Sequence, residues 1–287
     1  MEVKKMMAKV FKIILAKRPI NTNIVTLAPN SLLIGRTALI TGGTSGIGYS
    51  IAESYLNAGA CVIITGRNEE RLYNTMDKLY RLSKNVIGCI LDNTKVDTFE
   101  NVFHSMLAEV KEKGFPNIDI LVNNAGVNFK GMPNVVESEY DLVLDTNLKG
   151  VFFLSQMFGK FMVNNQIKGN ILNIASASSL RPADSAYTVS KWGIRGLTLG
   201  LAKSLSKYGI TVNGLAPGPT ATPMIFKNGQ TNMALDRIPF GRYITPEEIA
   251  NMATILVSDM GRAIMGDTVY MTGGAGVLTY DDVNYSF

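Results

Sequence analysis

The sequence predicts a single doubly wound α/β domain built on a mostly parallel sheet of about seven strands. Short apolar, β-prone runs alternate along the chain with stretches of helical periodicity, as in strand–helix–strand units. Each run closes on small or polar residues, as strands do where they leave a sheet. The 287 residues contain no linker rich in proline or serine and no internal repeat. One domain with a large core therefore accounts for the length.

An apolar run at 36–41 is the expected first strand, and it leads into a glycine-rich turn. Gly42, Gly46 and Gly48 follow, and 51–56 then shows helical spacing. A strand, a glycine turn and a helix in this order let the backbone approach a phosphate closely, with a helix N-terminus facing it. The segment therefore predicts a site for a dinucleotide pyrophosphate. The alternative is that the glycines simply make a turn.

The second strand is expected at 61–66, directly before Arg67. An acidic residue at this strand end would bond the ribose 2′-hydroxyl of NAD, whereas a cation accommodates the 2′-phosphate of NADP. The stretch from Thr65 to Asn68 contains no acidic residue, and it contains Arg67. The sequence therefore favours NADP(H) over NAD(H). Ser45 supplies no second cation in the glycine turn, and Arg67 could also be a solvated loop residue.

Four further apolar runs are expected strands, and polar or small residues follow each of them. Ligands bind at the carboxyl ends of the strands in an open parallel sheet, so these residues are candidates for ligand contact. The runs are 86–91 before Asp92 and Asn93, 118–122 before the Asn-Asn-Ala-Gly of 123–126, 169–174 before Ala175 and Ser176, and 209–212 before Pro217 and Gly218.

Tyr187 and Lys191 stand four residues apart and would lie on one face of a helix. A free tyrosine has a pKa of about 10, which is too high for efficient proton transfer at neutral pH. A nearby lysine ammonium would stabilise the phenolate and lower that pKa. Alone, so short a pair is more often a surface aromatic beside a cation. The glycine segment and the strand ends favour the catalytic interpretation.

In their order, these motifs resemble the short-chain dehydrogenase/reductase family, in its compact branch. The resemblance runs from about residue 33 to 274. It rests on Thr-Gly-Gly-Thr-Ser-Gly-Ile-Gly at 41–48, Asn-Asn-Ala-Gly at 123–126, Asn147, Ser176, Tyr187, Lys191 and the Pro217-Gly218 loop. The family implies a Rossmann-type fold and hydride transfer between a nicotinamide cofactor and a carbonyl or alcohol substrate.

The resemblance also implies four catalytic residues. Tyr187 would be the general acid/base, and Lys191 would lower its pKa and hold the nicotinamide ribose hydroxyls. Ser176 would hydrogen-bond the substrate oxygen. Asn147 would support a proton-relay water beside Lys191.

The serine is the one role for which the sequence offers alternatives. Ser176 lies just past its strand, but it is eleven residues before Tyr187, slightly closer than is usual in the family. Ser178 or Ser179 could therefore compete for the role. We expect Ser176 to hold it.

The family's cofactor contacts map onto the glycine turn and the strand ends. Asp92 would contact adenine, and the turn at 123–126 would back the cofactor. Thr220 and Thr222 would lie near the carboxamide and the pyrophosphate. The full set expected to bind cofactor is Gly42, Thr44, Ser45, Gly46, Ile47, Gly48, Arg67, Asn68, Asp92, Asn93, Asn124, Ala125, Gly126, Tyr187, Lys191, Pro217, Gly218, Thr220 and Thr222.

The stretch 223–243 follows the Pro217-Gly218 loop, where the family places a mobile lid over the substrate. Its apolar residues could form one wall of a pocket: Met224, Ile225, Phe226, Met233, Leu235 and Phe240. Lys227 and Arg237 could meet an acidic group or remain solvated. No residue in the lid identifies a substrate.

The expected function is NADP(H)-dependent interconversion of a ketone or aldehyde and an alcohol. A 3-oxoacyl-carrier-protein reductase and a sugar or polyol dehydrogenase share these motifs and remain alternatives. From another class, the chain could be a non-catalytic NADP-binding regulator. The intact set of proton-transfer residues argues against that alternative, because binding alone would not need them.

The cysteine and histidine content argues against a disulfide, a metal site and a Ser/His/Asp triad. Cys61 and Cys89 fall in expected core strands and are interpreted as buried hydrophobes without a disulfide. His104 is the only histidine, so we expect neither a metal site nor a Ser/His/Asp triad.

Residues 1–32 form an N-terminal extension that lies before the expected catalytic domain at 33–287. Six cations against one glutamate give residues 1–18 a net charge of +5, equal to that of the whole chain. The rest is near neutral, so we expect no nucleic-acid binding. An apolar stripe at helical spacing predicts a basic amphipathic helix, formed by Met7, Val10, Phe11, Ile14 and Leu15. It could pack on its own domain or a neighbouring subunit, which we favour, or lie on an anionic membrane. We expect a cytoplasmic protein, because Lys9 and Lys12 interrupt any signal-peptide core.

Two long helices, expected at 140–164 and 187–208, carry more apolar residues than one core-facing stripe needs. Closed symmetry is the commonest way to bury such a surface. We therefore expect a homodimer or homotetramer, with the tail at 278–287 covering neighbouring surface.

Overall fold

The computed structural model describes residues 31–226 and 232–278 and confirms the predicted fold class. Its centre is one sheet of seven strands in the order β3-β2-β1-β4-β5-β6-β7, with every neighbouring pair parallel. The strand order reverses direction between β1 and β4, and ligands bind at such a switch point in open α/β sheets. The strands are β1 (Thr37–Ile40), β2 (Cys61–Gly66), β3 (Val86–Ile90), β4 (Ile120–Asn123), β5 (Asn170–Ile174), β6 (Thr211–Pro217) and β7 (Thr268–Met271).

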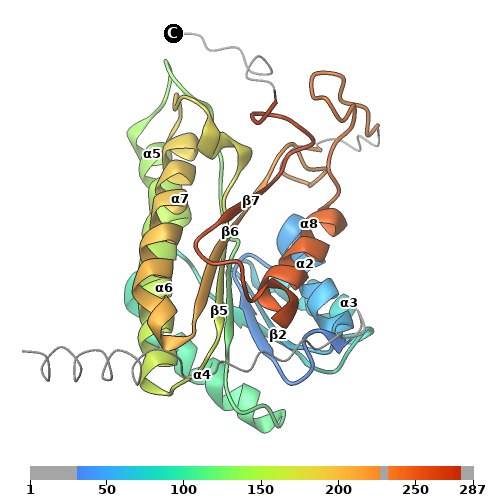
Figure 1. Ribbon diagram of the computed structural model, residues 1–287, viewed down its shortest axis with the longest axis vertical. Helices are drawn as coiled ribbons and strands as arrows, with labels where there is room; N and C mark the ends of the chain where they lie inside the picture. Colours follow the sequence, from blue (N-terminus) through green and yellow to red (C-terminus); the bar gives the residue numbers. More distant parts are fainter. Residues whose placement is uncertain (1–30, 227–231, 279–287) are drawn as a thin grey trace, which may run out of the picture.

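Helices cover both faces of the sheet and make a three-layer molecule (Figure 1). On one side lie α2, α3 and α8, and on the other α4, α5, α6 and α7. Their bounds are α2 (Gly46–Asn57), α3 (Glu69–Tyr80), α4 (Phe99–Glu112), α5 (Glu137–Leu144), α6 (Gly150–Asn164), α7 (Ala186–Leu205) and α8 (Pro246–Val257).

The core consists of two apolar layers, one on each face of the sheet. Successive strand residues point to opposite faces, so Ile40 and Ile64 belong to the layer under α2 and α8, whereas Leu39 and Ile63 belong to the layer under α4 and α6. Both faces are covered, which is why strands such as β1 and β2 are nearly continuous apolar runs rather than alternating patterns.

Two elements differ from the expectations. The sixth strand continues to Pro217, through the buried Asn213. The segment before β7 satisfies that amide: its Nδ2 donates to the Ile264 carbonyl at 2.6 Å and its Oδ1 accepts from the Asp267 N–H at 3.2 Å. The helix expected at 140–164 contains a π-helical segment, Asp145–Lys149. Apolar spacing does not reveal such an insertion, which is frequent at functional sites.

Some expectations lie outside the described residues. These are the N-terminal extension up to residue 30, Lys227 of the expected lid, and residues 279–287 of the tail. Leu33, where the catalytic domain was expected to begin, is buried in the core, and its N–H donates to the Ala58 carbonyl at 2.9 Å. Within 31–226 and 232–278, no helix is both long and apolar enough to cross a membrane.

Candidate active site

A cavity of about 370 Å³ opens at the carboxyl ends of the strands, at the switch point between β1 and β4. Three groups of residues from separate parts of the chain line it: the glycine turn after β1, the ends of β2, β4 and β5, and the start of α7 with the loop after β6. The fold thus gathers around one cavity most of the residues singled out in the sequence.

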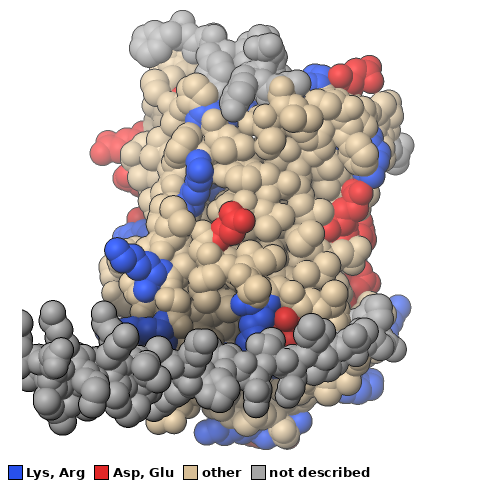
Figure 2. Space-filling model, viewed as in Figure 1, with Lys and Arg blue, Asp and Glu red and all other residues tan. Residues whose placement is uncertain are grey.

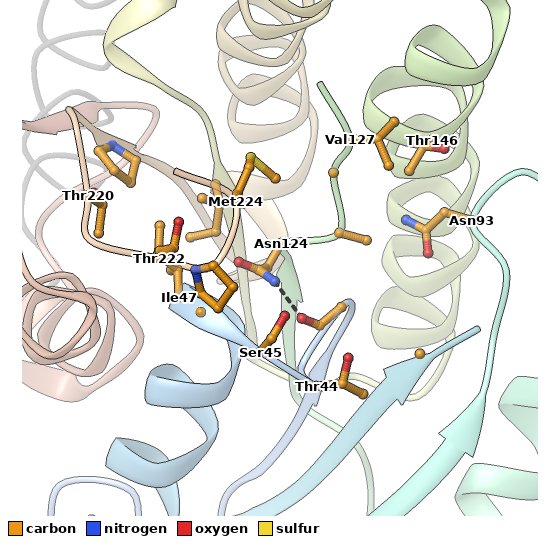
Figure 3. Close-up of a pocket in the computed structure, with 18 of the residues that line it drawn as sticks. Thr44, Ser45, Ile47, Asn93, Asn124, Val127, Thr146, Thr220, Thr222 and Met224 are labelled. Atoms are coloured by element: carbon orange, nitrogen blue, oxygen red, sulfur yellow. Dashed lines mark hydrogen bonds between the residues drawn. The ribbon is translucent and has the colours of Figure 1, made fainter. Parts of the chain in front are cut away.

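The glycine turn is shaped by close backbone packing. Gly42 and Gly46 have positive φ angles of 65° and 55°, a conformation that side chains disfavour. A Cβ on Gly48 would lie 2.4 Å from Nδ2 of Asn124 and 2.5 Å from the Gly42 carbonyl oxygen. Asn124 fastens the turn, since its Nδ2 donates to the Thr41 carbonyl at 2.9 Å and to the Gly42 carbonyl at 3.0 Å. Figure 3 shows one dashed line running from Asn124 to the turn. Because α2 starts here, its N-terminus faces the cavity, which suits a pyrophosphate.

The end of β2 presents two guanidinium groups. Arg67 follows the strand, and Arg71 lies one helical turn further on; both line the cavity. Between them, Asn68 caps α3 by accepting from the Arg71 N–H at 2.7 Å. Arg71 was missed in the sequence, where only the strand end was searched. The pattern that could have revealed Arg71 is its spacing of four residues from Arg67, across the start of a helix.

The end of the cavity beside β3 is lined by one of the two residues expected after that strand. Leu91, Asn93 and Thr146 line it, but Asp92 does not. The Asp92 carboxylate instead accepts from the N–H and hydroxyl of Thr94, at 3.0 and 2.9 Å. Nδ2 of Asn93 and Oγ1 of Thr146 are buried and have no hydrogen-bond partner within the described residues. With the glycine cradle, these unsatisfied polar atoms make the cavity fit a dinucleotide.

Ser176, Tyr187 and Lys191 meet on the wall formed by β5 and α7. Ser185 begins α7 as its N-cap, so both Tyr187 and Lys191 lie in the first two turns. Lys191 is buried, with 4% exposure, and its Nζ donates to the Ile174 carbonyl at 2.7 Å. Nζ also lies 5.5 Å from the centre of the Tyr187 ring. The pair can therefore hold and move a proton beside the cavity.

The pKa values of this pair are set first by burial. Burial raises the pKa of the Tyr187 phenol, and a hydrogen bond with the Ser176 side chain opposes that rise. Burial lowers the pKa of the Lys191 ammonium to about 8. From the sequence, Lys191 was expected to lower the pKa of Tyr187. That effect is not the dominant one here, because desolvation disfavours the charged form of both groups.

Of the three candidate serines, Ser176 is the one that lines the cavity. Its Oγ accepts from the Ser178 N–H at 3.1 Å, which fixes the start of a short 3₁₀ turn. Ser179 is buried, and its hydroxyl donates to the Ser176 carbonyl at 2.8 Å. The turn thus orients Ser176 and directs the other two away.

Asn147 lies behind the cavity wall and not on it. Its Oδ1 accepts from the Val127 N–H at 2.8 Å, and its Nδ2 donates to the Val127 carbonyl at 2.9 Å and to Oγ of Ser190 at 3.3 Å. Ser190 in turn donates to the Tyr187 carbonyl at 2.6 Å. Asn147 therefore links the loop after β4, through Val127, to α7, the helix that carries Tyr187. Ser190, between the two motif residues, was not singled out in the sequence.

The loop after β6 closes one side of the cavity. Met224 and Ile225 line it, beside Thr220 and Thr222 (Figure 3). Phe226 points elsewhere and packs edge-on against Tyr243, with ring centres 4.8 Å apart. The other expected wall residues, Met233, Leu235 and Phe240, do not line the cavity.

Among the described residues, no cluster of His, Cys, Asp and Glu could hold a metal ion.

Comparisons with known proteins agree with this geometry. The family model for short chain dehydrogenases matches residues 36–232. The chain is 34% identical over 247 residues to 3-oxoacyl-[acyl-carrier-protein] reductase FabG of Thermotoga maritima, covering 84% of this chain and 98% of the relative. It is 33% identical over 249 residues to the 3alpha-hydroxysteroid dehydrogenase of Mediterraneibacter gnavus, covering 85% and 98%.

Solved structures of short-chain dehydrogenases and reductases also match the fold of this chain. A short-chain dehydrogenase/reductase from Serratia marcescens superposes with a TM-score of 0.75 at 30% identity, covering 86% of this chain and 99% of that one. A 3-ketoacyl-(acyl-carrier-protein) reductase from Brucella melitensis, complexed with NADH, has a TM-score of 0.75 at 28% identity and covers 85% and 100%. The chain therefore belongs to the short-chain dehydrogenase/reductase family, enzymes that bind a nicotinamide cofactor and interconvert carbonyl and alcohol groups.

Proposed function

We propose that this enzyme reduces a ketone or aldehyde with NADPH and that Tyr187 supplies the proton. The observation that carries the proposal is the meeting of Ser176, Tyr187 and Lys191 on one wall of the dinucleotide cavity. Turnover of a panel of carbonyls and alcohols, with NADPH and NADH in parallel, tests it. The FabG relative makes 3-oxoacyl thioesters worth including in that panel.

In the proposed mechanism, each side chain has one role. The cofactor, when bound, supplies a hydride to the carbonyl carbon. The Tyr187 hydroxyl gives its proton to the carbonyl oxygen, and the Ser176 hydroxyl donates a hydrogen bond to the same oxygen. The Lys191 ammonium stabilises the phenolate that remains. Asn147 and Ser190 hold the tyrosine helix and the Val127 segment in register.

The pH dependence of reduction should report Lys191. Its pKa is lowered to about 8, so the ammonium is present below that pH and lost above it. The Tyr187 pKa is raised above its ordinary value of 10.0, so the phenol keeps its proton through the same range. We expect kcat for carbonyl reduction to fall as pH rises through about 8.

Lys191→Arg is the matched control for this profile, because a guanidinium stays protonated at every pH tested. The fall near pH 8 should vanish in that variant, whatever its absolute rate. An identical fall in both proteins would contradict the assignment.

We also propose that NADPH is preferred, through Arg67 and Arg71. Arg67→Ala and Arg71→Ala should each weaken NADPH binding by about 10–100-fold, since a hydrogen bond to a charged group is worth about 1.5–3 kcal/mol. NADH binding should change by less than about threefold, because only NADPH carries the 2′-phosphate. Fluorescence titration measures both. Arg262→Ala, which removes an exposed cation paired with Asp259, is the control. Equal losses for the two cofactors would refute the preference.

For assembly, we propose a homodimer or homotetramer through α6 and α7. Large apolar side chains on these helices are exposed, among them Phe152 and Leu199, at 46% and 57%. Charged side chains are sparse over the centre of the face that includes α7 and β7 (Figure 2). Sedimentation at micromolar concentration should show a dimer or tetramer, and Phe152→Glu/Leu199→Glu should dissociate it. Met260→Glu, at another exposed apolar residue, should not. A strictly monomeric wild type would end this proposal.

A further inference from the structure

A second cavity, of about 340 Å³, lies outside the active site, between α3 and the edge strand β3. Its floor and walls are largely apolar, yet several of these side chains are open to solvent: Tyr73 is 64% exposed, and Tyr80 and Ile90 are each 45% exposed. We call it the α3–β3 groove. Its lining residues are Glu69, Leu72, Tyr73, Met76, Asp77, Tyr80, Gly88 and Ile90.

The α3–β3 groove is lined by acidic residues, and one cation, Lys84, lies at its end. Glu69 and Asp77 are the charged residues that line it, and both are acidic. They stand two helical turns apart on α3, so their Cα atoms are separated by about 12 Å along the groove. At one end, the face of the Tyr80 ring already accepts an ammonium, since Nζ of Lys84 lies 3.6 Å from its centre. A complementary occupant is therefore apolar with cations along its sides.

Residues 1–18 of this chain have that chemistry. They carry six cations against one glutamate, and their apolar residues Met7, Phe11 and Ile14 recur at helical spacing. The remaining residues carry as many cations as anions, so the net positive charge of the chain equals that of this segment. Eighteen residues in a helix would span about 27 Å and the twelve of α3 span about 18 Å, so the segment is long enough to cover the groove.

The attachment point of this segment lies close to the α3–β3 groove. Leu33 is fixed to Ala58 just before β2, and β2 is the neighbour of β3. The groove is therefore about one strand spacing away, or about 5 Å across the sheet. Residues 19–30 can span up to about 40 Å when extended. So short a tether gives the segment of the same chain an advantage over that of a second copy.

We propose that residues 1–18 dock in the α3–β3 groove of their own chain. Lys side chains along the segment meet Glu69 and Asp77, and its apolar stripe covers Tyr73, Met76 and Ile90. The segment thereby covers the exposed edge of β3, which would otherwise be open to pairing with other chains.

Proteolysis of the full-length protein tests the contact. A docked segment resists trypsin after Lys9 and Lys12, so Glu69→Lys/Asp77→Lys should speed those cleavages at least tenfold. The matched control is Glu100→Lys/Glu112→Lys, which makes the same charge change on α4, on the other face of the sheet, and should leave the rates unchanged. Equal rates in wild type and both variants would overturn the proposal.

Zero-length carbodiimide cross-linking identifies the occupant. Wild-type protein should yield peptides that join a lysine of residues 1–18 to Glu69 or Asp77. In a mixture of ¹⁴N- and ¹⁵N-labelled chains, these peptides should carry one label only. Mixed-label peptides would assign the groove to a second copy and overturn the proposal. So would an absence of such peptides together with binding of the protein, through residues 1–18, to phosphatidylserine vesicles.

Discussion

Tyr187→Phe should lower the turnover of carbonyl reduction by about 10²–10⁴-fold, which is the usual contribution of general acid–base catalysis. The substitution removes the transferable proton and keeps the ring, so the packing of α7 changes little. Affinity for NADPH should stay within about threefold of the wild type, because the glycine turn and the arginines of the β2 end are untouched. Steady-state kinetics and cofactor titration on the same preparation separate the two effects.

Two comparisons sharpen this result. Tyr208→Phe, near the exposed end of the same helix region, should leave turnover unchanged. Ser176→Ala should be severely impaired and Ser178→Ala much less so, since only the first of these serines lines the cavity. Near-normal turnover of Tyr187→Phe, or a larger loss in Ser178→Ala than in Ser176→Ala, would refute the assigned roles.

Gly48→Ala should abolish measurable cofactor binding or weaken it by more than about 100-fold. The new methyl group would lie 2.5 Å from the Gly42 carbonyl oxygen, a backbone atom, and 2.4 Å from the Asn124 amide that fastens the turn. Either the backbone of the turn or the Asn124 side chain must therefore move. Backbone N–H groups of a displaced turn no longer face a pyrophosphate in the required geometry. Calorimetric titration with NADPH measures the loss.

Gly196→Ala is the control for the same chemical change. Gly196 lies in α7, and a Cβ there meets nothing within 4 Å. Alanine favours a helix interior by about 0.5–1 kcal/mol over glycine, so this variant should bind NADPH normally and be as stable as the wild type or more so. Undiminished cofactor affinity in Gly48→Ala would show that the turn does not cradle the pyrophosphate.

The parallel sheet was predictable because its strands are buried on both faces. Nearly continuous apolar runs such as 36–41 and 61–66 need no knowledge of their neighbours to be recognised. Tyr187 and Lys191 were equally accessible, because a fixed spacing on a helix determines a shared face. Local rules sufficed for these features.

Features that depend on contacts between distant segments were not predictable in the same way. The π-helical segment at 145–149 adds no signal to apolar periodicity, yet it places Asn147 against Val127. The raised pKa of Tyr187 follows from burial, which spacing along a helix does not report.

The most direct test of the account is transfer of deuterium from NADPH labelled at the nicotinamide C4 position. Wild-type protein, incubated with the carbonyl panel, should produce an alcohol that carries the deuterium on its carbinol carbon, and Tyr187→Phe should produce it at least about 10²-fold more slowly. Tight binding of NADPH with no deuterated alcohol from any carbonyl of the panel would contradict hydride transfer and favour a cofactor-binding regulator.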